Sequence, residues 1–141
     1  MKELWKPGWT EFDGEFYSAP RLEMEPTPPH IPIYVGGLSD IALRRAARND
    51  GWIGYLITTD SAIERVDRLR EMRAERGLTM HDFTVLTPLT DAFTPEHYVR
   101  AEAGGINGII TMPWMFYTGP EGTLAEKIDG MRKFRKDLSL D

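Results

Sequence analysis

Two consecutive glycines, Gly36 and Gly37, are the feature of the sequence with the clearest chemical potential. They follow a β-rich run at residues 31–35 and lead directly into Ser39, which can cap a helix. Glycine lets a phosphate approach the main chain closely, and the amino end of a helix favours an anion. The pattern therefore indicates an anion-binding loop, to which Arg44 or Arg45 would add positive charge; a tight strand-to-helix turn without a ligand is the alternative that the residues leave open.

Other common site chemistries are not supported. No Gly-Lys-Ser/Thr follows the glycines, so the loop is no P-loop, and it lacks the third glycine of the dinucleotide fingerprint. The sequence has no cysteine, which excludes thiol catalysis and cysteine-ligated metals. His30, His81 and His97 have no metal-ligand spacing, so we expect no metal site and a solvated or capping role for the histidines.

Polar and aromatic residues follow the other expected strands. A site on a parallel sheet is built at the carboxyl ends of its strands. The residues available there are Tyr55, Thr58, Thr59, Asp60, Thr90, Asp91, Trp114, Phe116 and Tyr117. The aromatic stretch at residues 113–117 suits a flat ring system, and a hydrophobic rim or subunit contact is an equally good interpretation.

Four strand–helix units position these residues. Apolar strands are expected at residues 31–35, 52–57, 83–87 and 106–112. Helices are expected to begin at Ser39 or Asp40, at Ser61, at Thr94 and at Thr123. Apolar strands alternating with amphipathic helices indicate a parallel sheet covered by helices. A small doubly wound sheet and four units of a (β/α)₈ barrel both fit this α/β pattern.

The two ends of the chain carry their own signals. Asp13-Gly14 predicts a β-hairpin with a two-residue turn, and the proline-rich residues 20–32 predict an extended connector. The last helix is expected to place its apolar residues on one face. These residues are Leu124, Ile128, Met131, Phe134 and Leu138.

Composition limits the classes of protein further. The chain has 141 residues, 41% of them hydrophobic and 28% charged, with a net charge of −5. These values predict one globular domain and argue against a nucleic-acid partner. No apolar run approaches the roughly 20 residues that span a bilayer, and no signal peptide is recognisable. We therefore expect a cytoplasmic protein that neither crosses a membrane nor binds one.

Three segments together resemble a known family. They are residues 29–39, which contain the glycine pair, residues 42–48, and the Asp50-Gly51-Trp52-Ile53 sequence. They closely resemble the luciferase-like monooxygenase superfamily, in particular its flavin- or F420-dependent members. The Phe12-Asp13-Gly14-Glu15-Phe16-Tyr17 hairpin and the closing residues 127–134 also match, so the similarity covers nearly the whole chain.

The resemblance implies a fold and a site. The fold would be the C-terminal half of a (β/α)₈ barrel, with residues 1–30 as the end of a helix plus an insertion and residues 31–141 as four βα units of one partial domain. Gly36, Gly37 and Ser39 would hold the phosphate of the cofactor, with Val35 and Leu38 as neighbours. The cofactor would be F420 or FMN, with F420 slightly favoured. The residues on the substrate side would be Tyr55, Thr58, Thr59, Trp114 and Tyr117.

Two hypotheses about function follow. In the first, the chain is part of an oxidoreductase or monooxygenase acting on a small molecule, with no residue that can be matched to a catalytic proton donor. In the second, it is a non-catalytic half-barrel that binds phosphate-bearing ligands. A lone half-barrel exposes two sheet edges, so we expect it to associate with itself as a homo-oligomer or with a separate N-terminal half-barrel.

Overall fold

The computed structural model describes residues 2–139, which form two compact units divided between Pro32 and Ile33. The first unit contains the 3₁₀ helix η1 (Lys2–Trp5) and the antiparallel pair β1 (Thr10–Asp13) and β2 (Ser18–Leu22). The predicted hairpin is confirmed, but its turn has four residues rather than two. Asp13 pairs with Ser18, and the Gly14 N–H donates to the Tyr17 carbonyl at 3.0 Å. The Phe12 ring lies over Gly14, where a Cβ would be 2.7 Å from ring carbons.

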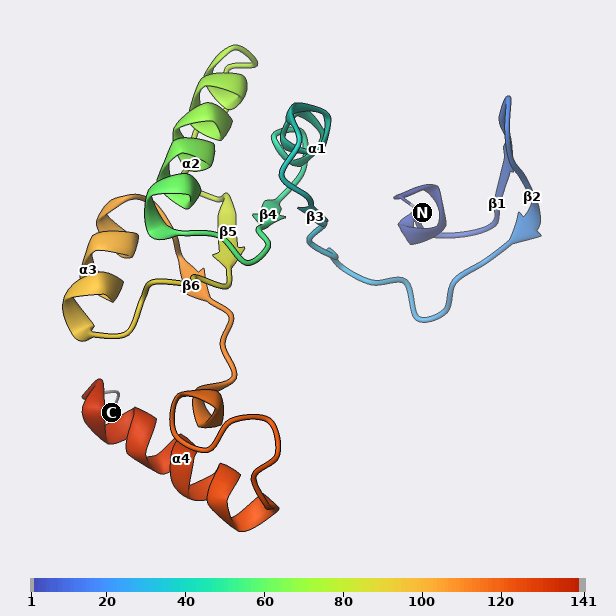
Figure 1. Ribbon diagram of the computed structural model, residues 1–141. Coiled ribbons are helices and arrows are strands. Elements are labelled where there is room, and N and C mark those ends of the chain that lie inside the picture. The colour runs from blue at the N-terminus through green and yellow to red at the C-terminus, as the bar shows by residue number, and fades with distance from the viewer. Residues whose placement is uncertain (1, 140–141) are drawn as a thin grey trace. The chain divides into compact units, whose positions relative to one another are not determined.

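The second unit is built on a four-stranded parallel sheet (Figure 1). Its strands are β3 (Tyr34–Gly36), β4 (Gly51–Ile53), β5 (Thr84–Thr87) and β6 (Gly108–Ile109). The helices that follow the strands are α1 (Asp40–Ala46), α2 (Thr59–Ala74), α3 (Pro95–Ala103) and, after the 3₁₀ helix η2 (Pro113–Phe116), α4 (Leu124–Asp137). The predicted alternation of parallel strands and helices is confirmed.

The order of the strands distinguishes the two architectures that the sequence leaves open. Each strand pairs with its neighbour in the chain, in the order β3-β4-β5-β6. A doubly wound sheet reverses its strand order at a switch point, whereas a (β/α)₈ barrel adds strands in one direction. The observed order is that of half a barrel.

Several boundaries differ from the sequence prediction: β3 begins at Tyr34 rather than at residue 31, and β6 covers only Gly108–Ile109 of the predicted residues 106–112. Helix α2 begins at Thr59 rather than after Ser61, because the Thr58 side chain caps it by accepting a hydrogen bond from the Ser61 N–H. Strand β4 ends at Ile53 rather than near Ile57. The chain leaves the sheet at Gly54 and pairs again at one bridge, between Ile57 and Leu89.

One face of the sheet carries the hydrophobic core. Trp52 and Val85 lie side by side in the register of β4 and β5, and both are fully buried with Val66 and Leu69 of α2. Side chains alternate between the two faces of a strand. Their neighbours along each strand therefore point to the opposite face.

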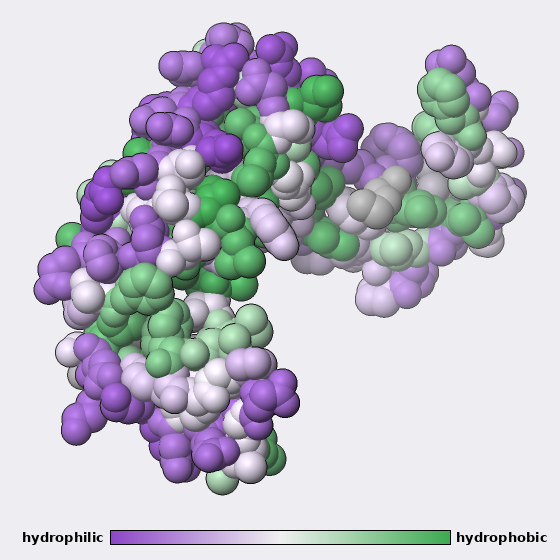
Figure 2. Space-filling model, viewed as in Figure 1, coloured by the Kyte–Doolittle hydropathy of each residue, from purple (hydrophilic) through white to green (hydrophobic). Residues whose placement is uncertain are grey.

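That opposite face is open among residues 2–139. Tyr34, Ile53 and Leu86 project from it and are only partly buried. The Tyr34 ring covers Gly51, where a Cβ would lie 2.6 Å from the ring, and Leu86 covers Gly108 in the same way at 2.7 Å. Large side chains thus fill the space above glycines of the next strand, as in the layered interior of a barrel, where alternate strands supply each layer. Figure 2 shows hydrophobic side chains at the surface around β4 and β5, next to the hydrophilic outer side of α2.

Helix α4 also has a partly uncovered apolar face. Its predicted capping box is confirmed, with Thr123 and Glu126 exchanging hydrogen bonds. Phe134 is buried, but the Leu124 side chain is 76% exposed and Ile128 and Met131 are exposed as well. None of the helices within residues 2–139 is long and apolar enough to cross a membrane.

Candidate functional site

The glycine pair forms the turn between β3 and α1, as the sequence predicts. Gly37 has φ +114°, a conformation that side chains rarely adopt, and a Cβ there would lie 2.9 Å from the Ala42 Cβ. At Gly36 an added Cβ would meet only the Ile53 carbonyl oxygen, at 3.9 Å. Both glycines and Ser39 are exposed, so the outer edge of the loop is accessible.

Trp52 fixes this loop from inside the core. Its Nε1–H donates to the Gly37 carbonyl at 2.7 Å, and the indole is fully buried. The flanking residues Val35 and Leu38 pack against the same core. The carbonyl of Gly37 is therefore directed toward the interior, and the loop has a defined conformation without a ligand.

Asp50 and Gly51 align β3 with β4. The Asp50 Oδ2 accepts a hydrogen bond from the Ile33 N–H at 2.8 Å, and the Asp50 N–H donates to the Ile33 carbonyl at 3.0 Å. A Cβ at Gly51 would lie 2.6 Å from the Thr84 carbonyl oxygen. The Asp50-Gly51-Trp52 sequence therefore has a structural explanation: it sets the register of two strands and holds the glycine loop.

The charges near the loop partly offset one another. Ser39 Oγ accepts a hydrogen bond from the Ala42 N–H at 3.3 Å, which leaves its hydroxyl proton available to an anion. Asp40 is in the first turn of α1, where its carboxylate opposes an anion, and Arg68 of α2 lies 3.9 Å from that carboxylate. Arg44 and Arg45 are in the last turn of α1, so the cation that the structure places against Asp40 is Arg68, whose closer partner is Glu71 at 2.8 Å. Because Arg68 lies 29 positions from Ser39 in the sequence, no local sequence pattern predicts that it approaches Asp40.

The predicted substrate-side residues after β4 have different surroundings. Tyr55 is exposed, and its carbonyl accepts a hydrogen bond from the buried Thr87 hydroxyl at 3.3 Å. Thr58 caps α2. Thr59 is 2% exposed, and its N–H and hydroxyl both donate to Asp91 Oδ1 at 2.8 Å. Within this group, the Tyr55 side chain is exposed, whereas Thr58 and Thr59 make the local contacts that organise the loop.

Asp91 joins the loops that follow β4 and β5. Partial burial disfavours its charged form, but the hydrogen bonds from Thr59 outweigh this effect and hold the pKa of Asp91 below its ordinary value of 3.8. A carboxyl group with a lowered pKa stabilises the fold above its unfolded-state pKa and loses that contribution as the pH falls through its folded-state pKa. Asp91 therefore stabilises this rim at neutral pH; the contribution declines below about pH 4 and is lost once the pH falls below the folded-state pKa.

Replacing Asp91 with alanine is expected to lower the free energy of unfolding by about 2 kcal/mol at pH 7, because it leaves two buried donors of Thr59 without an acceptor. Urea unfolding measures the change, and the difference from the unsubstituted chain should shrink as the pH is lowered. Asp60→Ala is the matched control. Asp60 is next to Thr59 in the first turn of α2, but its side chain takes part in an exposed ion pair with Arg100. Equal losses for both variants would contradict the role of Asp91.

The aromatic stretch after β6 packs on α4. Phe116 stacks on Phe134 with ring centroids 5.4 Å apart, and the Tyr117 hydroxyl donates to Asp137 at 2.9 Å. Trp114 is half-buried where α4 carries Gly130, at which a Cβ would be 3.0 Å from the Trp114 Cα. These contacts support the hydrophobic-contact interpretation for Phe116. A substrate-side role for Trp114 and Tyr117 remains a prediction.

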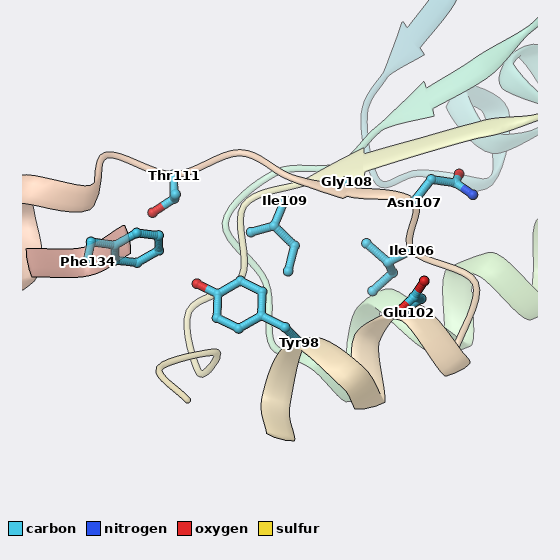
Figure 3. A pocket seen from close by; sticks show the side chains of 8 residues that line it. All are labelled: Tyr98, Glu102, Ile106, Asn107, Gly108, Ile109, Thr111 and Phe134. Carbon is cyan, nitrogen blue, oxygen red and sulfur yellow. The ribbon is translucent and has the colours of Figure 1, made fainter. Parts of the chain in front are cut away.

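A cavity of about 330 Å³ lies between α3, β6 and α4 (Figure 3). Ile106 and Ile109 point toward Tyr98 of α3, and Phe134 of α4 closes one end. Burial raises the pKa of the Tyr98 hydroxyl. The cavity contains none of the predicted site residues, and Gly108 and Ile109 of β6 form part of its lining.

The histidines have no metal-binding arrangement. Within residues 2–139, no three side chains of His, Cys, Asp or Glu are grouped to hold a metal ion. His97 Nδ1 accepts hydrogen bonds from the Phe93 and Thr94 N–H groups at 3.1 and 3.2 Å. It therefore caps α3, which confirms the capping role for this histidine.

The sequential parallel strands, the connecting helices and the glycine turn at the carboxyl end of β3 define a half-barrel of the (β/α)₈ class. The family model described as luciferase-like monooxygenase matches residues 1–103. The chain belongs to this family.

Curated relatives agree over a longer range. An uncharacterized protein of Mycobacterium bovis and two of Mycobacterium tuberculosis strains are each 41% identical to the chain over 134 residues. Each match covers 91% of this chain and 45% of the relative. The chain thus spans about half the length of these relatives.

Proposed function

We propose that the chain supplies the cofactor-phosphate loop of a flavin- or F420-dependent oxidoreductase. The observation that carries the proposal is the Gly36–Gly37 turn, which Trp52 holds in a conformation that only glycine adopts readily, beside the exposed amino end of α1. The residues fit a phosphate: Gly36 leaves space for close approach, Ser39 has a free proton to donate, and Arg68 offsets the charge of Asp40.

Each part of the chain has a defined task in this proposal. Gly36, Gly37 and Ser39 bind the phosphate, and Val35 and Leu38 anchor the loop in the core. The ring system of the cofactor and the substrate are proposed to face Tyr55, Trp114 and Tyr117. The bound cofactor supplies the redox chemistry, by accepting or delivering a hydride or by activating oxygen. F420 is slightly favoured over FMN.

The proton-transfer groups of such an enzyme are expected outside this chain, since it spans 45% of its relatives and offers no matched proton donor. A non-catalytic half-barrel that binds phosphate-bearing ligands is the second candidate. The open apolar face formed by Tyr34, Ile53 and Leu86 favours it, because a substrate pocket needs that face to be covered. A cytoplasmic location, which fits the lack of cysteine in the sequence, also stays a prediction.

Titration of the chain into F420 and, separately, into FMN tests the proposal through cofactor fluorescence. Saturable binding is expected, and Ser39→Ala should weaken it about 10-fold by removing one hydrogen bond to a charged group. Thr123→Ala is the matched control, because it removes the cap of α4 far along the chain from the loop and should leave affinity within 2-fold. Equal affinities for both variants would contradict the assignment of the loop.

A further inference from the structure

We propose that the cavity between α3, β6 and α4 is a second binding site, for a small organic amine that carries a hydroxyl group at its other end. The proposal is independent of the cofactor loop. Ile109, which lines the cavity, packs against the core on the helix side of β6, whereas the glycine loop follows β3. The volume of about 330 Å³ lies at the lower end of the range for small-molecule sites.

The walls of the cavity are mostly apolar, and a row of aromatic rings holds them in place. Ile106 is buried, and Phe134 closes one end (Figure 3). Phe116 stacks on Phe134 and also meets Phe93, which precedes α3, with ring centroids 5.7 Å apart. These three rings connect α4 to the segment that leads into α3. The cavity is therefore bounded by connected elements, and its walls suit the apolar body of a ligand.

Three polar side chains of the lining have no hydrogen-bond or ion-pair partner within residues 2–139. The Tyr98 hydroxyl points into the cavity, toward the end where the Thr111 hydroxyl lies (Figure 3). The third is the carboxylate of Glu102, one turn along α3 from Tyr98. Asn107 differs, because its Oδ1 accepts a hydrogen bond from the Val85 N–H at 2.5 Å. Partial burial of a hydroxyl without a partner is unfavourable, so these groups indicate a ligand that hydrogen-bonds to them.

Glu102 determines the class of ligand. It is the one charged side chain among the eight residues that line the cavity. Arg70, which lies near the adjoining Gly105, is already paired with Asp67. A carboxylate binds an ammonium group through charge-assisted hydrogen bonds. The ligand therefore places an ammonium group at Glu102 and a hydroxyl group at the opposite end.

Amide NMR of the chain during titration with tyramine tests the proposal, because tyramine has an ammonium group at one end and a phenol hydroxyl at the other. It is expected to shift the signals of Ile106, Ile109 and Thr111 saturably and to leave those of Gly36 and Gly37 in place. 4-Ethylphenol lacks the amine and should bind about 5-fold more weakly, since Glu102 is exposed at the rim and its ion pair is partly solvated. The proposal is overturned if tyramine shifts no signals saturably or shifts only those elsewhere in the chain.

Substitutions in α3 separate the ammonium site from the hydroxyl site. Glu102→Gln should weaken tyramine binding about 5-fold and leave 4-ethylphenol within about 2-fold. Glu64→Gln is the matched control, because Glu64 is also an exposed helical glutamate but lies outside the lining. Tyr98→Phe keeps the ring and should weaken both phenols about 5-fold by removing one hydrogen bond.

Glu102 is exposed and has no side-chain partner within residues 2–139, so its replacement should leave the fold intact, which circular dichroism checks. Unchanged tyramine affinity in Glu102→Gln, or an equal loss in Glu64→Gln, would overturn the assignment of the ammonium site. Unchanged affinity of both phenols in folded Tyr98→Phe would overturn the assignment of the hydroxyl site.

Discussion

Replacement of Trp52 with alanine is expected to lower the free energy of unfolding by about 4 kcal/mol, which is a large part of the stability of a domain of this size. Trp52 is fully buried between the sheet and the helices, and its removal leaves a cavity next to Val85 and Val66. It also leaves the Gly37 carbonyl without its hydrogen bond. Urea denaturation followed by circular dichroism measures the change.

Trp52→Phe separates the two contributions of the indole. Phenylalanine keeps most of the apolar volume but cannot donate to Gly37, so the variant should fold with a smaller loss of stability and should bind cofactor more weakly. Full cofactor affinity in folded Trp52→Phe would show that the hydrogen bond does not organise the loop.

The second large effect is expected at Gly54, where Gly54→Val should lower the free energy of unfolding by about 3 kcal/mol or more. Even a Cβ at this position would lie 2.7 Å from the Thr87 Cβ and 2.9 Å from the Trp52 Cη2, with the Thr87 hydroxyl closer still. Thr87 and Trp52 are fully buried, so neither side chain can move aside. Thermal unfolding should show a lower Tm or no cooperative transition.

Gly36→Val is the matched control for Gly54→Val. Gly36 ends β3 of the same sheet as Gly54 follows β4, but its surroundings are open and the atom closest to an added Cβ is 3.9 Å away. The change in stability should therefore be small, although the added side chain would obstruct the phosphate loop. Equal destabilisation at both positions would contradict the packing described around Thr87.

Local patterns in the sequence predict much of the fold. The caps at Ser39, Thr94 and Thr123 and the glycine turn after β3 depend on residues a few positions apart, and the structure has them where they are expected. The predicted cap of α2 is wrong by three residues, because Thr58 and Ser61 both have cap chemistry and the helix begins at Thr59, which hydrogen-bonds to Asp91, 32 residues away.

The site is less predictable from the sequence, because it depends on contacts between segments that are far apart in the chain. The bond from Trp52 to Gly37, the pairing of Arg68 with Asp40 and the contact of Asp91 with Thr59 all join segments that become neighbours only when the parallel sheet forms. Sequence spacing identifies the glycine loop but not the side chains that hold it. The open face could be anticipated from the number of strands, whereas the covering of Gly51 by Tyr34 depends on the register.

Backbone amide NMR of the chain would show whether the Gly36–Ser39 loop binds the phosphate of a cofactor. FMN, F420 and riboflavin, which lacks the phosphate, are titrated in parallel. FMN is expected to shift the amide signals of Gly36, Gly37 and Ser39 saturably, whereas riboflavin should leave them in place. Loop signals that stay in place with both FMN and F420, or that shift equally with riboflavin, would show that the loop does not bind the phosphate.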